Sequence, residues 1–136
     1  WYALYSGINR ANMFLENIDK VNGFDAGVKE QYIAEARFLR AFYYFNLVEC
    51  WGDVPFKTVS TQSVTNLNIP RTDKQEIYDF IVSEMADAAE TPSPPHGAYW
   101  HVYICSVQAS ITVKAAMPHR QKRKTISKKP ASTPRK

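Results

Sequence analysis

The segment 38–48 constrains the fold of this chain more than any other part of the sequence, because it is apolar on nearly every face of a helix. Only Arg40 and Asn46 interrupt it. Its apolar and aromatic residues are Phe38, Leu39, Ala41, Phe42, Tyr43, Tyr44, Phe45, Leu47 and Val48. A helix of this kind must be covered by neighbouring elements on several sides. We therefore expect residues from about 25 to 49 to form the central helix of a fold larger than these 136 residues.

An amphipathic helix is predicted over residues 1–19. Side chains suited to one buried face recur there at three- and four-residue steps, the spacing of a helix surface. They are Tyr2, Tyr5, Ile8, Asn12, Leu15 and Ile18. Gly23 and Asp25 then predict a turn, because glycine readily adopts the left-handed conformation that often closes a helix.

The long central helix is expected to end near residue 51. Gly52 permits a left-handed turn, and Pro55 disfavours the helical conformation at Val54. Residues 56–70 are polar and lack periodicity, which predicts a loop.

A third helix is predicted after Pro70. Two overlapping pairs fit the spacing of a capping box, Thr72 with Gln75 and Asp73 with Glu76. The apolar stripe of this helix consists of Ile77, Ile81, Met85 and Ala88. We expect its carboxylates to face other ways and to be solvated; they are Asp79, Glu84 and Asp87.

The composition of the chain changes abruptly after Glu90. Residues 91–136 hold nine of the 17 Lys and Arg residues and none of the 13 Asp and Glu residues. We therefore predict two regions: a helical segment over 1–90 that is an incomplete domain, and a Pro-rich basic tail over 91–136. Within the tail, an apolar stretch at 98–113 could form a strand, and the residues from 114 onward are expected to be disordered.

Three runs of residues resemble one family. The first is Tyr5–Asn12, followed by Leu15 and Ile18. The second is Ala34–Phe45, closed by Leu47–Val48 and then Trp51–Pro55. The third is Arg71, followed by Glu76–Tyr78, Ile81, Glu84 and Ala88–Ala89. Their order and spacing resemble the SusD/RagB family, whose hallmark is a helix similar to EARFLRAFYYF that ends in WGDVP. The resemblance covers about residues 1–90.

The resemblance implies an all-α fold of tetratricopeptide-like helix pairs. It also implies a protein at the extracellular face of the cell outer membrane of Bacteroidetes-type bacteria, held there by a lipid anchor. Such a protein captures oligosaccharides or other nutrients and passes them to a SusC-like TonB-dependent transporter. The lipidated cysteine is expected upstream of this fragment. The sugar-contacting residues of family members lie mainly outside the matched stretch, so no ligand-binding residue is assigned.

The tail departs from the family, which continues with a Gly-containing loop and an Ala/Leu-rich helix. Loss of carboxylates, gain of cations and loss of periodicity at one point suggest a shifted reading frame from about residue 91. On that hypothesis the tail has no evolved function, and the chain could be a non-functional gene fragment.

Arg37 and Arg40 interrupt the apolar surface of the central helix. An unpaired buried charge is costly, so we expect both guanidinium groups to find partners. The candidates are Asn9, Asn12, Glu35 and freed carbonyl groups near Trp51.

Two further residue types have a structural and a functional interpretation. Trp51 could stack on a sugar ring, but a tryptophan at the close of a buried helix is more typical of a packing plug. Cys50 and Cys105 are too far apart for a CxxC pair, and Cys50 is expected to be a buried free thiol.

We expect no enzymatic activity and predict no catalytic, cofactor-binding or metal-binding residue. His96, His101 and His119 all lie in the tail that lacks carboxylates, and no nucleotide-binding or nucleophile motif is present. The tail cations would bind nucleic acid only nonspecifically. A tetratricopeptide-like protein-interaction scaffold remains an alternative function, because helix pairs of this type often only hold partners.

Overall fold

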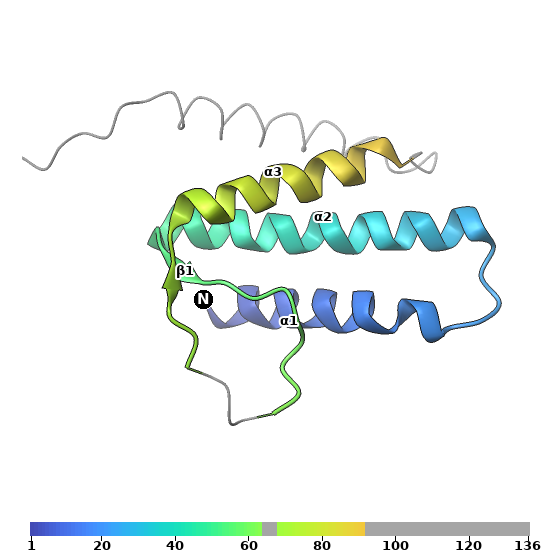
Figure 1. Cartoon of the computed structure of the whole chain (residues 1–136), viewed down its shortest axis with the longest axis horizontal. Coiled ribbons are helices and arrows are strands. Elements are labelled where there is room, and N and C mark those ends of the chain that lie inside the picture. Colours follow the sequence, from blue (N-terminus) through green and yellow to red (C-terminus); the bar gives the residue numbers. More distant parts are fainter. Residues whose placement is uncertain (64–67, 92–136) are drawn as a thin grey trace, which may run out of the picture.

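The computed structural model describes residues 1–63 and 68–91. Three helices dominate this part of the chain: α1 (Tyr2–Asn17), α2 (Ala26–Trp51) and α3 (Lys74–Glu90). Figure 1 shows α2 between α1 and α3, each of which packs along it. The expected central helix and the expected helical fold are therefore confirmed.

Helix α1 continues into a short 3-10 turn, Ile18–Lys20, before the chain reverses. Gly23 has a φ of 100°, as the turn prediction requires. The predicted buried face is partly correct: Ile8, Asn12 and Ile18 are buried, but Tyr2 is 85% exposed. Tyr2 is the first residue of the helix, where no other described element covers it.

A close approach joins α1 to α2 at Gly7. A Cβ atom built on Gly7 would lie 2.5 Å from Cε2 of Tyr43 on α2. Glycine is therefore the residue that lets the Tyr43 ring lie against the backbone of α1.

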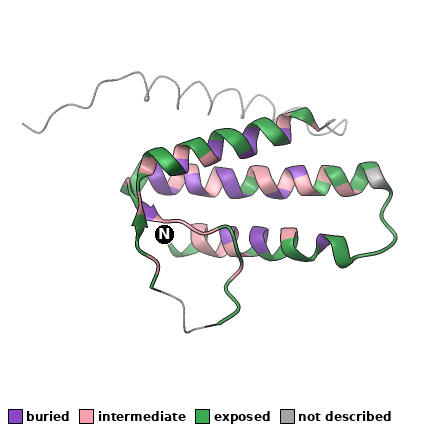
Figure 2. Ribbon diagram, viewed as in Figure 1, coloured by how far each residue is buried: buried purple, intermediate pink, exposed green. Residues whose placement is uncertain are grey.

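The core lies where the three helices meet the short strand after α2. Its buried residues are purple in Figure 2 and line the inner faces of the helices. They are Ile8, Ala41, Tyr44, Leu47, Val48, Val54, Ile77, Ile81 and Met85. The predicted stripe of α3 is confirmed, because all four of its members are buried. Among residues 1–63 and 68–91, α1 and α3 are the helices that pack on α2, and Leu39 in its apolar segment stays 43% exposed.

A two-residue strand pair closes the end of the bundle, which the sequence did not predict. Strand β1 (Val54–Pro55) pairs antiparallel with β2 (Arg71–Thr72). Gly52 has a φ of 70°, which turns the chain out of α2 and into β1, as expected.

Asp73 caps α3 by accepting a hydrogen bond from the Gln75 backbone N–H at 2.7 Å. This confirms Asp73 over Thr72 as the cap. Next to it, the Lys74 backbone N–H donates to Asp53 Oδ1 at 3.1 Å, which ties the start of α3 to the end of α2.

None of the described helices is long and apolar enough to cross a membrane. The strand predicted at 98–113, the disorder predicted from 114 and Cys105 lie outside the described residues. The division at residue 90 and the shifted reading frame stay predictions.

Candidate functional site

The chain that leaves β1 is held against α1 and α2 by side chains. We call residues 55–61 the bridging segment. The Tyr5 hydroxyl donates to the Pro55 carbonyl at 2.7 Å, and Asn12 Nδ2 donates to the carbonyls of Lys57 and Val59 at 3.4 and 3.1 Å. These bonds satisfy backbone groups that a strand partner would otherwise satisfy.

Tyr44 fixes the middle of the bridging segment from α2. Its hydroxyl donates to the Lys57 carbonyl at 2.8 Å and accepts from the Lys57 N–H at 2.9 Å. Burial raises the pKa of Tyr44 to about 12. The hydroxyl therefore keeps its proton at neutral pH and can make both bonds.

The outer part of the bridging segment is bound by α1. Glu16 accepts hydrogen bonds from the backbone N–H and the hydroxyl of Ser60, at 2.6 and 2.5 Å. These bonds lower the pKa of the Glu16 carboxyl. Two turns nearer the start of α1, Asn9 Oδ1 accepts from the Thr61 N–H at 2.7 Å. Helix α1 thus binds the segment near both of its ends, at Pro55 and Thr61, and at residues between them.

Arg40 lies behind the bridging segment, where it joins all three helices. Its Nε and Nη2 donate to Glu84 Oε2 at 3.0 and 2.5 Å, and its Nη1 donates to Asn12 Oδ1 at 2.9 Å. Nη1 also reaches the Thr58 carbonyl at 3.5 Å, and the guanidinium carbon lies 5.3 Å from the centre of the Phe80 ring. The expectation that Arg40 pairs with Asn12 is confirmed.

The expectation for Glu84 is wrong. Glu84 is 8% exposed rather than solvated, and its carboxylate is the counter-ion of Arg40. The physical reason is its position on α3: Glu84 lies between Ile81 and Ala88 on the buried stripe, opposite the arginine.

The other predicted arginine partners are distributed differently. Arg37 pairs with Asp87 at 3.1 Å. Both side chains are partly exposed, so the pair contributes little to the stability of the fold. Glu35 accepts from Gln31 at 3.5 Å, and Asn9 binds Thr61.

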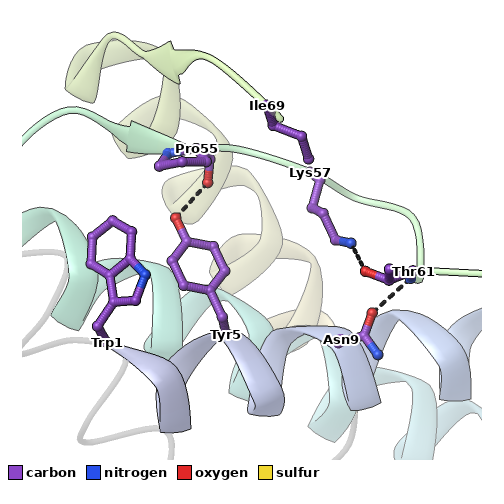
Figure 3. A pocket seen from close by; sticks show the side chains of 7 residues that line it. All are labelled: Trp1, Tyr5, Asn9, Pro55, Lys57, Thr61 and Ile69. Carbon is purple, nitrogen blue, oxygen red and sulfur yellow. Dashed lines mark hydrogen bonds between the residues drawn. The ribbon is translucent and has the colours of Figure 1, made fainter. Parts of the chain in front are cut away.

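A hollow of about 230 Å³ opens between the start of α1 and the bridging segment. Figure 3 shows the side chains that line it, which combine two aromatic rings with an amide, an ammonium group and a hydroxyl. They are Trp1, Tyr5, Asn9, Pro55, Lys57, Thr61 and Ile69. Lys57 Nζ donates to the Thr61 hydroxyl across this hollow. A mixture of aromatic surface and a few polar groups is typical of small-ligand sites.

Two tryptophans meet at the aromatic end of this hollow. The Trp1 ring lies 5.0 Å from that of Tyr5 and 5.3 Å from that of Trp51, edge-on to the latter at 82°. The prediction that Trp51 is a packing plug is wrong, because Trp51 is 46% exposed. It supports the Trp1 ring from one side instead.

Cys50 is also exposed rather than buried, although Val48, two residues earlier in the same turn of α2, belongs to the core. Among the described residues, no group of three or more His, Cys, Asp or Glu side chains could hold a metal ion. His96, His101 and His119 lie outside the described residues.

The sequence did not point to the lining of this hollow. Tyr5 and Asn9 are four residues apart on one helix face, which was a usable signal. Lys57 and Thr61 come from a segment without periodicity, and its hydrogen bonds to α1 and α2 bring them to the site.

Comparisons with known proteins agree on one family. Residues 1–104 match the SusD-like family model described as "Starch-binding associating with outer membrane". SusD-like protein P38 of Formosa agariphila is 37% identical over 89 residues, which cover 65% of this chain and 17% of that protein.

Solved structures agree. A SusD superfamily protein from Bacteroides thetaiotaomicron is similar with a TM-score of 0.68 and 30% identity, covering 82% of this chain and 29% of that one. A laminarin-binding SusD-like protein is similar with a TM-score of 0.63 and 32% identity, covering 67% of this chain and 20% of that one. The chain therefore spans less than a third of the length of these relatives. On the family match and the shared helical fold, it belongs to the SusD-like family of carbohydrate-binding proteins associated with the outer membrane.

Proposed function

We propose that this chain is part of the glycan-binding component of a SusC/SusD-type uptake system. In this proposal the protein is lipid-anchored at the extracellular face of the outer membrane. It binds an oligosaccharide, performs no chemistry on it, and delivers it to a SusC-like TonB-dependent transporter.

The observation that carries the proposal is the family match over residues 1–104. The laminarin-binding relative supports an oligosaccharide as the class of ligand. The hollow beside Trp1 adds a site whose aromatic and hydrogen-bonding groups suit a sugar.

The three helices supply the framework in this proposal. Arg40 joins α1, α2 and α3 through Asn12 and Glu84, and the bridging segment is bonded to this framework at most of its residues. A preorganised surface loses less entropy when a ligand binds, which favours capture at low concentration.

The proposal is tested in cells that express the chain from its own locus with an affinity tag. Purification from detergent-solubilised outer membranes is expected to recover a TonB-dependent transporter in stoichiometric amount. A tagged outer-membrane lipoprotein of unrelated fold is the control. If the tagged chain is recovered from the outer membrane without a transporter, the partnership is refuted.

A further inference from the structure

We propose that the hollow beside Trp1 binds an acidic sugar, a uronate unit of an oligosaccharide, with its ring on the Trp1 indole and its carboxylate on Lys57. This inference rests on the proposed glycan-binding function and makes the class of ligand more specific.

The Trp1 indole is placed to act as a platform. It is 47% exposed, and its ring centroid lies 5.0 Å from that of Tyr5 and 5.3 Å from that of Trp51. Contacts from two rings restrict its rotation, so little side-chain entropy remains to be lost on binding. The C–H face of a pyranose ring can pack on such an indole, whose face carries partial negative charge.

Lys57 supplies a cation whose main chain is fixed. Its backbone N–H and carbonyl both bind the Tyr44 hydroxyl, and the carbonyl also accepts from Asn12. The side chain that carries the ammonium group into the hollow therefore starts from a fixed backbone position. There it donates to the Thr61 hydroxyl, which is a neutral partner.

The charge of Lys57 lacks a counter-ion in the part of the chain that the structure describes. The salt bridges in that part join Lys29 to Asp19 and each of two arginines to a carboxylate on α3. Both oxygens of Glu16, which lines the adjoining surface, are bound by Ser60. A ligand carboxylate would supply the missing negative charge through a charge-assisted hydrogen bond.

The surroundings favour an oligosaccharide over a single acidic sugar. A second hollow of about 470 Å³ shares Lys57, Thr61 and Ile69 with the first and continues past Ser60 and Gln62. Lys57 thus lies where the two hollows join. Hydroxyl and amide side chains along the second hollow can bind the hydroxyl groups of neighbouring sugar units.

Calorimetric titration of the full chain tests this inference. The probes are tetragalacturonate and maltotetraose, which have the same number of sugar units but differ in charge. The variants are Lys57→Met, which keeps the length of the stem and removes the charge, and Trp1→Ala. Lys20→Met is the matched control, because it removes an exposed lysine from the 3-10 turn that follows the opposite end of α1. Thermal melts establish that each variant is folded.

Tetragalacturonate is expected to bind more tightly than maltotetraose, and less tightly as salt is raised. Lys57→Met is expected to weaken tetragalacturonate binding by about five-fold, which is the scale of a partly exposed ion pair. It should leave the affinity for maltotetraose unchanged. Trp1→Ala should weaken the binding of both ligands, and Lys20→Met should change the binding of neither.

Equal affinity for both sugars, or unchanged tetragalacturonate binding in a folded Lys57→Met variant, would overturn the inference and leave the glycan-binding proposal standing. If neither sugar binds, the inference also fails. Whether glycan binding itself fails is then decided separately by the labelling of intact cells with a wider panel of glycans.

Discussion

Arg40 and Glu84 form a buried ion pair in which two guanidinium nitrogens share one carboxylate oxygen, at 3.0 and 2.5 Å. This pair joins α2 to α3, and the same arginine holds Asn12 on α1. One side chain on the central helix therefore connects all three helices, directly behind the segment that lines the candidate site.

Removing the carboxylate of this pair should destabilise the fold strongly. Glu84→Ala leaves a buried arginine without its counter-ion, which typically costs about 3 to 5 kcal/mol of unfolding free energy. Asp87→Ala is the matched control, because it removes a carboxylate from a partly exposed pair one turn away and should cost about 0.2 to 1 kcal/mol. Urea denaturation followed by circular dichroism measures both. Similar losses for the two variants would contradict the assigned role of Arg40.

Two glycines should respond to alanine with opposite signs. Gly7→Ala places a Cβ 2.5 Å from the Tyr43 ring, so the ring must move, and we expect a loss of about 1 to 3 kcal/mol. Gly27→Ala, in the first turn of α2, meets no atom within 4 Å. It should stabilise the chain by about 0.5 to 1 kcal/mol, because alanine restricts the unfolded state. Thermal melts in one buffer compare the melting temperatures of the two variants with that of the natural chain. A stabilising effect of Gly7→Ala would refute the close packing of α1 on α2.

The Tyr44 hydroxyl should control the order of the bridging segment. Tyr44→Phe keeps the ring but leaves the Lys57 N–H without its partner and the Lys57 carbonyl with Asn12 alone, which we expect to cost about 1 to 3 kcal/mol. Hydrogen exchange at the Lys57 amide should accelerate in this variant. Tyr32→Phe is the control, because that ring is 44% exposed and lies away from the segment. Unchanged exchange at Lys57 would show that Tyr44 does not hold the segment.

Alkaline pH should destabilise the fold through Tyr44. Its pKa is about 12 in the folded chain and about 10 when unfolded, so the unfolded state loses its proton first. The stabilising contribution is complete below about pH 10 and is lost between about pH 10 and 12, at about 1.4 kcal/mol per pH unit. Tyr5 and Tyr78 add to this, because burial raises the pKa of both. Urea denaturation at several alkaline pH values should give a shallower decline for Tyr44→Phe than for the natural chain; equal slopes would exclude Tyr44 as a contributor.

The helices could be predicted because their signals are local. Ile77, Ile81 and Ala88 repeat at helical spacing, and Gly52 and Pro55 end the central helix through their own backbone constraints. Glu84 was within reach as well, since it falls on the same stripe and a buried Arg40 requires an acidic partner.

The candidate site was not predictable in this way. Its shape depends on where the bridging segment is placed against α1. Bonds between residues 44 to 52 positions apart, such as Asn12 to Val59 and Asn9 to Thr61, decide that placement. Exposure of Trp51 and Cys50 likewise depends on which faces of the last turn of α2 other elements cover, which periodicity within one helix does not show.

Capture of glycans at the cell surface is the function that we propose for this protein. Its most direct test is to incubate intact cells with fluorescently labelled oligosaccharides, neutral and acidic, in a strain with the locus intact and in one with it deleted. We expect surface labelling by at least one glycan that disappears on deletion and returns when the locus is restored. Identical labelling of both strains with every glycan would contradict it.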